Sequence, residues 1–254
     1  MRIAAVLAVA LLPLTALADD QGPSQSALIW ARDTVTERLK DPIPAEDFPA
    51  GREWLNVSKP LSLATNLQNK IVLLDFWTYC CINCMHVLPD LEYLEKKYAA
   101  KGLAVVGVHS AKFTNEKGTR QIREAVRRYE IHHAIVNDAD FAIWRSYGAR
   151  AWPTFALVAP GGTYVGRLSG EGNREELEAL IIALLERFEG KLDTKPLPLE
   201  LESSTRASGP LAYPGKVAVS ADEQRLWIAD SNHNRIVEID VSSKWRFVRA
   251  FGDG

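Results

Sequence analysis

Cysteine is scarce in this chain of 254 residues, and its scarcity excludes one class of protein. Only Cys80, Cys81 and Cys84 are present, all within five positions. This set leaves one odd thiol and cannot form the framework of disulfides that stabilises small secreted domains. The chain also lacks the second Cys-x-x-Cys pair that a four-cysteine zinc site requires.

An excess of charge of one sign is also missing. The formal net charge is −2 at pH 7, which gives no reason to expect a nucleic acid or an anionic membrane as a partner. After residue 18, no apolar run is long enough to cross a bilayer. A chain of this length has room for one or two domains, each with its own core.

The first 18 residues have the pattern of a secretory signal peptide. Arg2 precedes an apolar run over residues 3–17, and Ala16-Leu17-Ala18 forms a cleavage sequence ahead of Asp19. No cysteine directly follows, which argues against a bacterial lipid anchor. We therefore predict a periplasmic or secreted protein, in a compartment where disulfide chemistry is active. An uncleaved N-terminal anchor is the alternative.

The most informative segment joins a buried strand to a pair of cysteines. Residues 71–74 form a continuous apolar run, which is typical of a central strand covered on both faces. Apolar residues then recur at helical spacing over residues 87–98. Cys81 thus lies where a strand gives way to a helix, and the free N–H groups of a helix N-terminus stabilise a thiolate. Cys84 follows one turn later, close enough to displace a mixed disulfide and close a ring.

Around these residues the chain resembles the thioredoxin superfamily. Asp75-Phe76-Trp77 stands where thioredoxins carry Asp-Phe-Trp, six positions before Cys81. The resemblance implies that Cys81 attacks a disulfide, that Cys84 resolves it, and that Asp75 moves a proton to or from Cys84. A carboxylate inside an apolar strand is costly unless it is used, and its burial raises its pKa.

A second stretch supports the same resemblance. Residues 151–155, Ala-Trp-Pro-Thr-Phe, are similar to the superfamily's cis-proline loop, which faces the cysteine pair and offers backbone groups to a peptide. The resemblance implies that Trp152, Pro153 and Thr154 bind the substrate. Residues 155–158 are then predicted to form a strand, with a hairpin turn at residues 160–162.

The order of the other elements favours an α/β fold, a thioredoxin-like three-layer domain with a mixed central sheet. Periodicity predicts strands over residues 103–109, 134–136 and 164–168, and helices over residues 27–39, 116–129, 139–147 and 174–188. Alternating strands and helices imply a parallel core, which the final hairpin makes mixed. The insertion between residues 116 and 136 resembles that of the peroxiredoxin and TlpA-like branch. We also predict an N-terminal hairpin within residues 54–63.

The C-terminal part of the chain changes character. Four short strand candidates lie between turn residues, at a spacing that suits one propeller blade: residues 216–219, 226–229, 235–239 and 246–251. Tyr213-Pro214-Gly215 and the turn over residues 229–236 resemble the NHL repeat. We expect Asp230, Asn232 and His233 to fix that turn through local hydrogen bonds.

The whole arrangement resembles the NHL-repeat-containing thioredoxin-like proteins, but with a single blade. One blade should not be stable alone, so we expect either a truncated chain or a blade that packs on another surface, and we favour truncation. The predicted order is a signal peptide, a polar N-terminal segment, a thioredoxin-like domain, a linker rich in proline, serine and charge, and an NHL blade, over residues 1–18, 19–50, 51–189, 190–212 and 213–254.

Several site residues allow other interpretations. Cys81 and Cys84 could form a structural pair or half of a zinc site. Cys80 takes the place of a thioredoxin tryptophan, so we expect a packed small residue there rather than a catalyst. His86 is expected to face outward on its helix.

A copper site is a further alternative. Copper chaperones of the Sco type combine two cysteines, spaced as Cys80 and Cys84 are, with a distant histidine. His109, His132 or His133 would supply the third ligand, and two thiolates with an imidazole suit copper. Against this, the Cys81–Cys84 pair matches the thioredoxin position better, and we predict no metal and no other cofactor.

Two functional classes remain. The first is a periplasmic thiol–disulfide oxidoreductase whose partners are protein thiols or disulfides. The second is a scaffold with little redox activity, whose NHL blade binds a protein partner. The residues between the cysteines, Ile82-Asn83, match neither the Gly-Pro of reducing thioredoxins nor the Pro-His of oxidising relatives, so the direction of exchange stays open.

Overall fold

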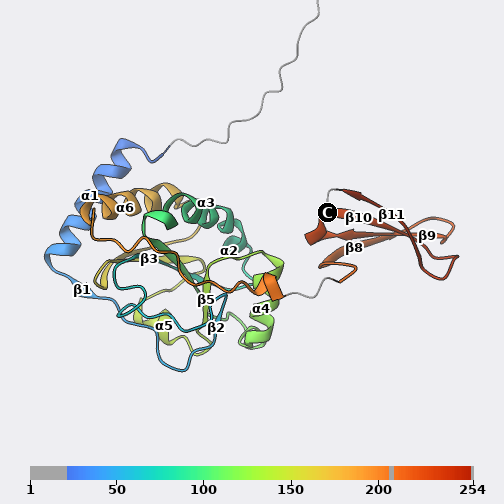
Figure 1. Ribbon diagram of the computed structural model, residues 1–254, viewed down its shortest axis with the longest axis horizontal. Helices are drawn as coiled ribbons and strands as arrows, with labels where there is room; N and C mark the ends of the chain where they lie inside the picture. Colours follow the sequence, from blue (N-terminus) through green and yellow to red (C-terminus); the bar gives the residue numbers. More distant parts are fainter. Residues whose placement is uncertain (1–21, 206–208, 253–254) are drawn as a thin grey trace, which may run out of the picture.

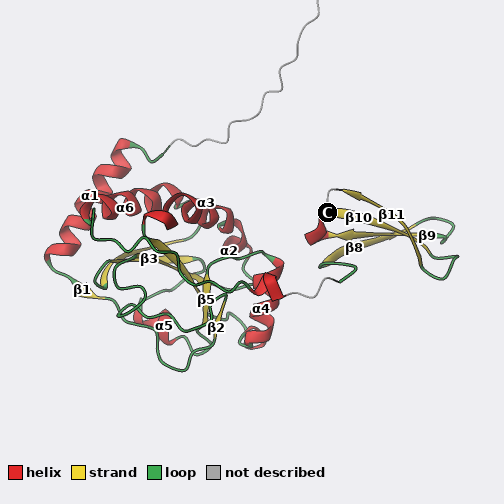
Figure 2. Ribbon diagram, in the orientation of Figure 1, coloured by secondary structure: helices red, strands yellow, loops and turns green. Residues whose placement is uncertain are grey.

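A seven-stranded sheet forms the centre of the larger part of the protein (Figures 1 and 2). The computed structural model describes residues 22–205 and 209–252, so the predicted signal peptide lies outside the described residues. The strand order is β1-β7-β6-β3-β4-β5-β2, with β3 in the middle. β3 runs parallel to β4 and antiparallel to β6, so the sheet is mixed, as predicted. The bounds are β1 Ile43–Pro44, β2 Trp54–Leu55, β3 Ile71–Trp77, β4 Leu103–His109, β5 Ala134–Asn137, β6 Thr154–Ala159 and β7 Thr163–Ser169.

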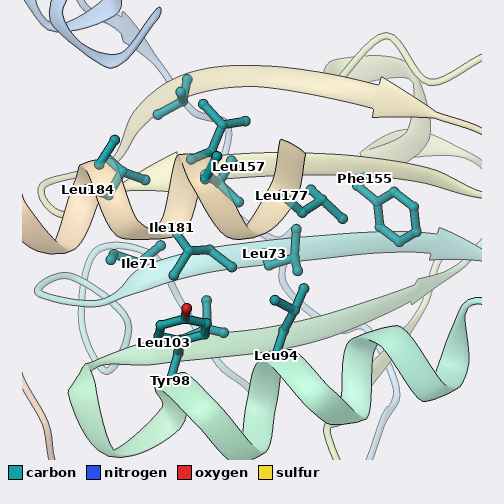
Figure 3. Close-up of a cluster of buried hydrophobic side chains, with 14 of the residues drawn as sticks. Ile71, Leu73, Leu94, Tyr98, Leu103, Phe155, Leu157, Leu177, Ile181 and Leu184 are labelled. Atoms are coloured by element: carbon teal, nitrogen blue, oxygen red, sulfur yellow. The ribbon is translucent and has the colours of Figure 1, made fainter. Parts of the chain in front are cut away.

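Helices cover both faces of this sheet. On one face lie α3 (Leu88–Tyr98) and α6 (Arg174–Arg187), and α1 (Gln25–Lys40) packs beside α6 (Figure 1). On the other face, α5 (Ala142–Ser146) contributes to a second core. Figure 3 shows the first core, where side chains of α3 and α6 meet those of the sheet: Ile71, Leu73, Leu94, Tyr98, Leu103, Phe155, Leu157, Leu177, Ile181 and Leu184.

Strand β3 contributes to both cores because its side chains alternate between the two faces. Leu73 belongs to the core under α3 and α6, and Leu74 belongs to the core under α5. All residues of β3 are buried, as the continuous apolar run predicts. By the same alternation, Asp75 lies on the face of Leu73, which is the face that α3 covers.

The predicted helix after the cysteines is divided in two. α2 (Ile82–His86) has Cys81 as its N-cap, and α3 begins after Val87. Pro89 lies in the first turn of α3, where its missing N–H costs nothing, but it cannot continue the hydrogen-bond ladder of α2. The cysteines therefore occupy a short helix of their own.

Two other predicted elements differ from the structure. The helix expected over residues 116–129 is shorter, since a 3-10 turn, η2 (Thr114–Glu116), and an extended Gly118 precede α4 (Thr119–Arg128). The hairpin expected within residues 54–63 is wrong, because β2 pairs with the edge of β5 instead. Asn56 ends β2 with a left-handed backbone (φ 60°), and its amide donates to the carbonyls of Ile131 and His133.

The C-terminal residues form a separate antiparallel sheet of four strands, in the order β11-β10-β9-β8. This is the four-strand unit that the sequence predicts. Its bounds are β8 Pro214–Val219, β9 Arg225–Asp230, β10 Arg235–Asp240 and β11 Arg246–Gly252. Several large apolar side chains on the strands and turns of this sheet are exposed to solvent: Val217, Val219, Ile236, Trp245, Phe247 and Phe251.

The turn between β9 and β10 is fixed by Asp230, as predicted. Its carboxylate accepts hydrogen bonds from the Ala212 N–H and the Arg235 guanidinium, and lies 2.7 Å from His233 Nδ1. Asn232 does not act within the turn through its side chain but donates to the Arg128 carbonyl in α4, at 2.9 Å. The second sheet thus contacts α4 (Figure 1).

Part of the predicted linker packs along the first sheet. The Lys70 ammonium is buried and donates to the carbonyls of Asp193 and Lys195, and the Glu200 N–H donates to the Asn56 carbonyl. The linker also contains a 3-10 turn, η3 (Glu202–Thr205), in which Glu202 forms an ion pair with Arg123 of α4. The domain boundaries themselves stay a prediction.

Candidate redox site

Cys81 and Cys84 lie on one turn at the start of α2. Cys81 is partly exposed, whereas Cys84 is 0% exposed. The Cys84 N–H donates to the Cys81 carbonyl at 3.0 Å, and the two thiols are within hydrogen-bond contact. The site therefore offers one thiol to solvent and keeps the second one shielded.

The carboxyl group of Asp75 shares the buried environment of Cys84. Asp75 is 0% exposed, and neither of its oxygens has a hydrogen-bond partner among the described residues. Burial raises the pKa of Asp75 to about 7, partly offset by the positive charge of His133. Burial also raises the pKa of Cys84 well above its usual range, and the negative charge of Asp75 raises it further. Ionisation of either group disfavours ionisation of the other, so at least one of the two keeps its proton near neutral pH.

The loop opposite the cysteines contains a cis peptide bond between Trp152 and Pro153, as the sequence predicts. The Cys81 sulfur lies 3.8 Å from the Trp152 carbonyl oxygen. The Trp152 indole donates to the Ser110 carbonyl at 2.9 Å, and its ring packs on Trp144 with centroids 4.5 Å apart. These contacts fix the backbone of Trp152 beside the exposed thiol.

Thr154 contributes no side chain to this surface. It is fully buried, and its hydroxyl donates to the Ala151 carbonyl at 2.8 Å. Of the three residues that the resemblance implies to bind substrate, Thr154 is therefore closed off from solvent.

Cys80 is exposed, so the expectation of a packed small residue is wrong. In the turn between β3 and α2 the ring of Tyr79 stacks on His109, with centroids 5.4 Å apart, and Cys80 is left at the surface. Partial burial of the sulfur raises the pKa of Cys80 to about 11, and a hydrogen bond to the Glu116 carboxylate adds to this. Cys80 therefore stays a thiol at neutral pH, and the thiol form is a poor nucleophile.

Glu116 is a buried carboxylate that the sequence did not reveal. It accepts hydrogen bonds from the Thr78 hydroxyl at 2.7 Å and from the N–H groups of Lys112 and Phe113. Burial alone raises its pKa, but these bonds and one from Cys80 outweigh burial and hold the pKa below its ordinary value. Glu116 thus ties the turn before the cysteines to the loop after β4.

The histidines of the alternative copper site are dispersed. His109 is fully buried between Trp77 and Tyr79, and its burial lowers its pKa to about 4. Within residues 22–205 and 209–252, no group of three or more His, Cys, Asp or Glu side chains is arranged to hold a metal ion. The set of Cys80 and Cys84 with His109, His132 or His133 is therefore not assembled. His86 is exposed, as predicted, with Nδ1 2.8 Å from Glu171.

A second buried group that the sequence did not reveal is His133. It is 4% exposed, and its Nδ1 lies 3.1 Å from a carboxylate oxygen of Glu95 in α3. A signal was present, since His133 directly precedes the predicted strand over residues 134–136. Alternation in that strand places His133 on the face of Ile135, which the helices cover.

Two family matches agree with this geometry. A thioredoxin-like family matches residues 69–164, and the NHL repeat family matches residues 211–239. The chain is a thioredoxin-like protein with an NHL repeat. The curated relatives of this thioredoxin-like NHL protein include the chloroplastic protein Suppressor of quenching 1 of Arabidopsis thaliana, 47% identical over 218 residues, and NHL repeat-containing protein 2 of Homo sapiens, 40% identical over 236 residues. The matches cover 84% and 85% of this chain but only 20% and 32% of those relatives.

The thioredoxin-like part also has relatives named for thiol–disulfide exchange. The thiol-disulfide oxidoreductase ResA of Bacillus cereus is 25% identical over 113 residues, which are 44% of this chain and 62% of that protein. Among solved structures, a thioredoxin-like protein in its oxidised form covers 57% of this chain and 97% of its own, with a TM-score of 0.51 and 21% identity. That structure supports the fold alone.

Proposed function

We propose that this thioredoxin-like NHL protein is a thiol–disulfide oxidoreductase of the periplasm or another compartment outside the cytoplasm. Cys81 attacks the disulfide of a protein substrate, Cys84 resolves the mixed disulfide, and Asp75 holds the proton that Cys84 releases. No cofactor is needed, since the two cysteines carry the electrons themselves. The domain boundaries proposed for this activity are residues 51–189 for the thioredoxin-like part and 213–254 for the blade.

The observation that carries this proposal is the unequal burial of the two thiols above one buried carboxyl group. Cys81 is open to solvent beside the Trp152 carbonyl, and Cys84 is closed off with Asp75. A structural pair of cysteines needs neither the accessible thiol nor the carboxyl group. Nucleophilic attack followed by internal resolution needs both.

The exchange conserves atoms and electrons. The Cys81 thiolate forms a bond to one sulfur of the substrate disulfide, whose other sulfur leaves as a thiolate. Cys84 then loses its proton to Asp75 and attacks the Cys81 sulfur; this closes the Cys81–Cys84 disulfide and releases the second substrate thiolate. Substrate is reduced by two electrons and the cysteine pair is oxidised, and the reverse sequence oxidises a dithiol. The backbone of Trp152 would hold the substrate chain beside Cys81.

The compartment follows from the N-terminal residues. Residues 1–18 have the arginine, the apolar run and the small-residue cleavage sequence of a secretory signal. Among the helices that the structure describes, none combines the length and apolarity needed to cross a membrane. A chloroplastic relative agrees with a location in which a leader directs the protein out of the cytoplasm.

The second sheet supports a different, additional role as a protein-binding scaffold. Val217, Val219 and Phe247 are each more than half exposed on its strands. Apolar side chains gathered in this way are typical of surfaces that pack against protein. Very slow exchange with model disulfides would favour the scaffold over the enzyme.

The test of the proposed function is mixed-disulfide trapping. We expect Cys84→Ser to accumulate a mixed disulfide through Cys81 with a disulfide-bonded substrate such as insulin, because the resolving thiol is gone. Non-reducing electrophoresis and mass spectrometry detect the adduct. Cys81→Ser is expected to trap nothing, and Cys80→Ser to turn over like wild type. Trapping through Cys84 or Cys80 instead would contradict the assigned order of attack.

A further inference from the structure

Several buried polar atoms without hydrogen-bond partners gather on one face of the first sheet. Among the described residues, none is within hydrogen-bond geometry of the two Asp75 oxygens, of Trp77 Nε1 or of His133 Nε2. Buried polar atoms nearly always have partners, and an exception calls for an explanation such as a redox or catalytic role or a bound water. These four atoms come from three residues that lie on the face covered by α2 and α3.

The register of the sheet explains why these atoms meet. Asp75 is opposite Gly107 in the parallel pair β3–β4, and Gly107 is opposite Ile135 in the pair β4–β5. A Cβ on Gly107 would lie 3.0 Å from Trp77 Nε1 and 3.3 Å from His133 Nε2. Because Gly107 has no side chain, the side chains of Ile135, Trp77 and His133 pack directly over its backbone, next to Asp75 in the neighbouring strand.

On its other side, His133 is connected to the surface. Its Nδ1 lies 3.1 Å from Glu95 Oε2, and the Glu95 side chain is 23% exposed. Glu95 and His133 both line a surface pocket of about 270 Å³, together with Met85 and Glu92. Because Asp75 is fully buried, His133 and Glu95 are the groups that link its surroundings to solvent.

From this geometry we propose that His133 and Glu95 are positioning residues that carry the proton of Asp75 between the buried site and solvent. The inference rests on the proposed function, in which Asp75 accepts the Cys84 proton. No hydrogen bond joins Asp75 to His133 among the described residues, so a bridging water molecule must carry the proton between them. The neutral His133 imidazole accepts it on Nε2, and the imidazolium so formed gives the proton on Nδ1 to Glu95. The Glu95 carboxyl group then releases it to water, and the same path runs backwards when Cys84 must be reprotonated.

The charges around His133 fit this task. Burial by itself lowers the pKa of His133, but the charge and hydrogen bond of Glu95, and the charge of Asp75, outweigh burial and raise it. The charged groups that face His133 are Asp75 from β3 and Glu95 from α3. Lys70 and Lys195 line a smaller cavity that His133 also lines. His133 therefore lies between two carboxyl groups, one buried and one in contact with water, which is the order that a relay requires.

The test measures the pKa of Asp75 directly, by ¹³C NMR of the carboxyl carbon in the reduced protein. We expect His133→Gln to raise the Asp75 pKa by about 1 unit, because a neighbouring positive charge is lost. Glu95→Gln is expected to shift the Asp75 pKa in the same direction, since a neutral amide in place of the Glu95 carboxylate no longer favours the protonated form of His133. His132→Gln, at the exposed adjacent histidine, is the matched control and should leave the Asp75 pKa unchanged.

The kinetic arm is stopped-flow measurement of the resolution step across pH. We expect His133→Gln and Glu95→Gln to slow resolution about 10-fold at pH 7, and the same step to slow in Asp75→Asn. An unshifted Asp75 pKa in both His133→Gln and Glu95→Gln overturns the relay, and so does a normal resolution rate in those variants when Asp75→Asn is slow. The proposed function survives either result, because it fails only if Cys84→Ser traps no substrate. Glu95 is partly exposed, so Glu95→Gln keeps the test valid if His133→Gln does not fold.

Discussion

At the scale of single residues, the protein keeps an ionisable group where ionisation is unfavourable. The Asp75 carboxyl group has an ordinary pKa of 3.8 and a pKa of about 7 in the folded protein, because burial penalises the charged form. The folded state thus binds a proton that the unfolded state has lost over the range between these two values. Stability must fall as pH rises through that window, and the loss is complete above pH 7.

Removing this carboxylate is expected to stabilise the protein at high pH. A pKa difference of about 3 units corresponds to about 4 kcal/mol, so we expect Asp75→Asn to raise the free energy of unfolding by about 2–4 kcal/mol at pH 8. The gain should disappear at about pH 3, below both pKa values, where the wild-type carboxyl group is protonated in the folded and the unfolded state. Urea unfolding of the reduced proteins at the two pH values measures it. An equal gain at both pH values would show that packing, and not charge, is responsible.

At the scale of elements, β4 has one position at which a side chain cannot be accommodated. A Cβ on Gly107 would lie 2.3 Å from Ile135 Cδ1 in the neighbouring strand, closer than real Cβ atoms approach. The backbone of Gly107 itself is ordinary strand, so the glycine is required by space and not by its φ angle. Trp77 Nε1 and His133 Nε2 also lie 3.0 and 3.3 Å from that Cβ position, which makes Gly107 part of the site.

We therefore expect Gly107→Ala to destabilise the protein by about 1–3 kcal/mol, the usual cost of overpacking a core. Gly166→Ala in β7 is the matched control, because a Cβ there would meet no described atom within 4 Å. Chemical denaturation of the two variants and wild type gives the comparison. Equal stability of the two variants would mean that Ile135 moves aside without cost.

At the scale of the whole molecule, the two sheets contact each other through α4. The Tyr213 hydroxyl lies 2.9 Å from a carboxylate oxygen of Glu124, and Asn232 donates to the Arg128 carbonyl. Both acceptors lie on one helix whose buried residues, such as Ile122, pack against Trp77 and Cys84. The blade is thus attached to the helix that also covers the cysteine site.

Exposed hydrogen bonds of this kind contribute only about 0.5–1.5 kcal/mol each, so the attachment should be easy to weaken. We expect the double variant Tyr213→Phe, Asn232→Ala to increase the radius of gyration measured by small-angle scattering. The thermal unfolding of the thioredoxin-like part should stay within about 2 °C of wild type, since its core contains neither residue. An unchanged radius of gyration would mean that other contacts hold the blade.

The sequence by itself determined the elements whose pattern is local. The apolar run over residues 71–74 and the four blade strands are found where periodicity and turn residues predict them, and the cis peptide bond lies in the loop that the resemblance to thioredoxins implied. The buried Asp75 with its raised pKa was also predictable, because a carboxylate inside a continuous apolar strand has no route to solvent. Each of these depends on neighbours close along the chain.

Only the tertiary structure decided which distant groups meet at the site. Glu116 lies 36 positions after Cys80 and adds to the rise in its pKa that burial causes, and His133 is brought to the far side of Asp75 by the pairing of three strands. The failed hairpin over residues 54–63 has the same origin, since β2 takes the open edge of β5. Which groups meet depends on the strand edges and helix faces that remain free once the sheet has formed. That is a property of the packed chain and not of any single segment.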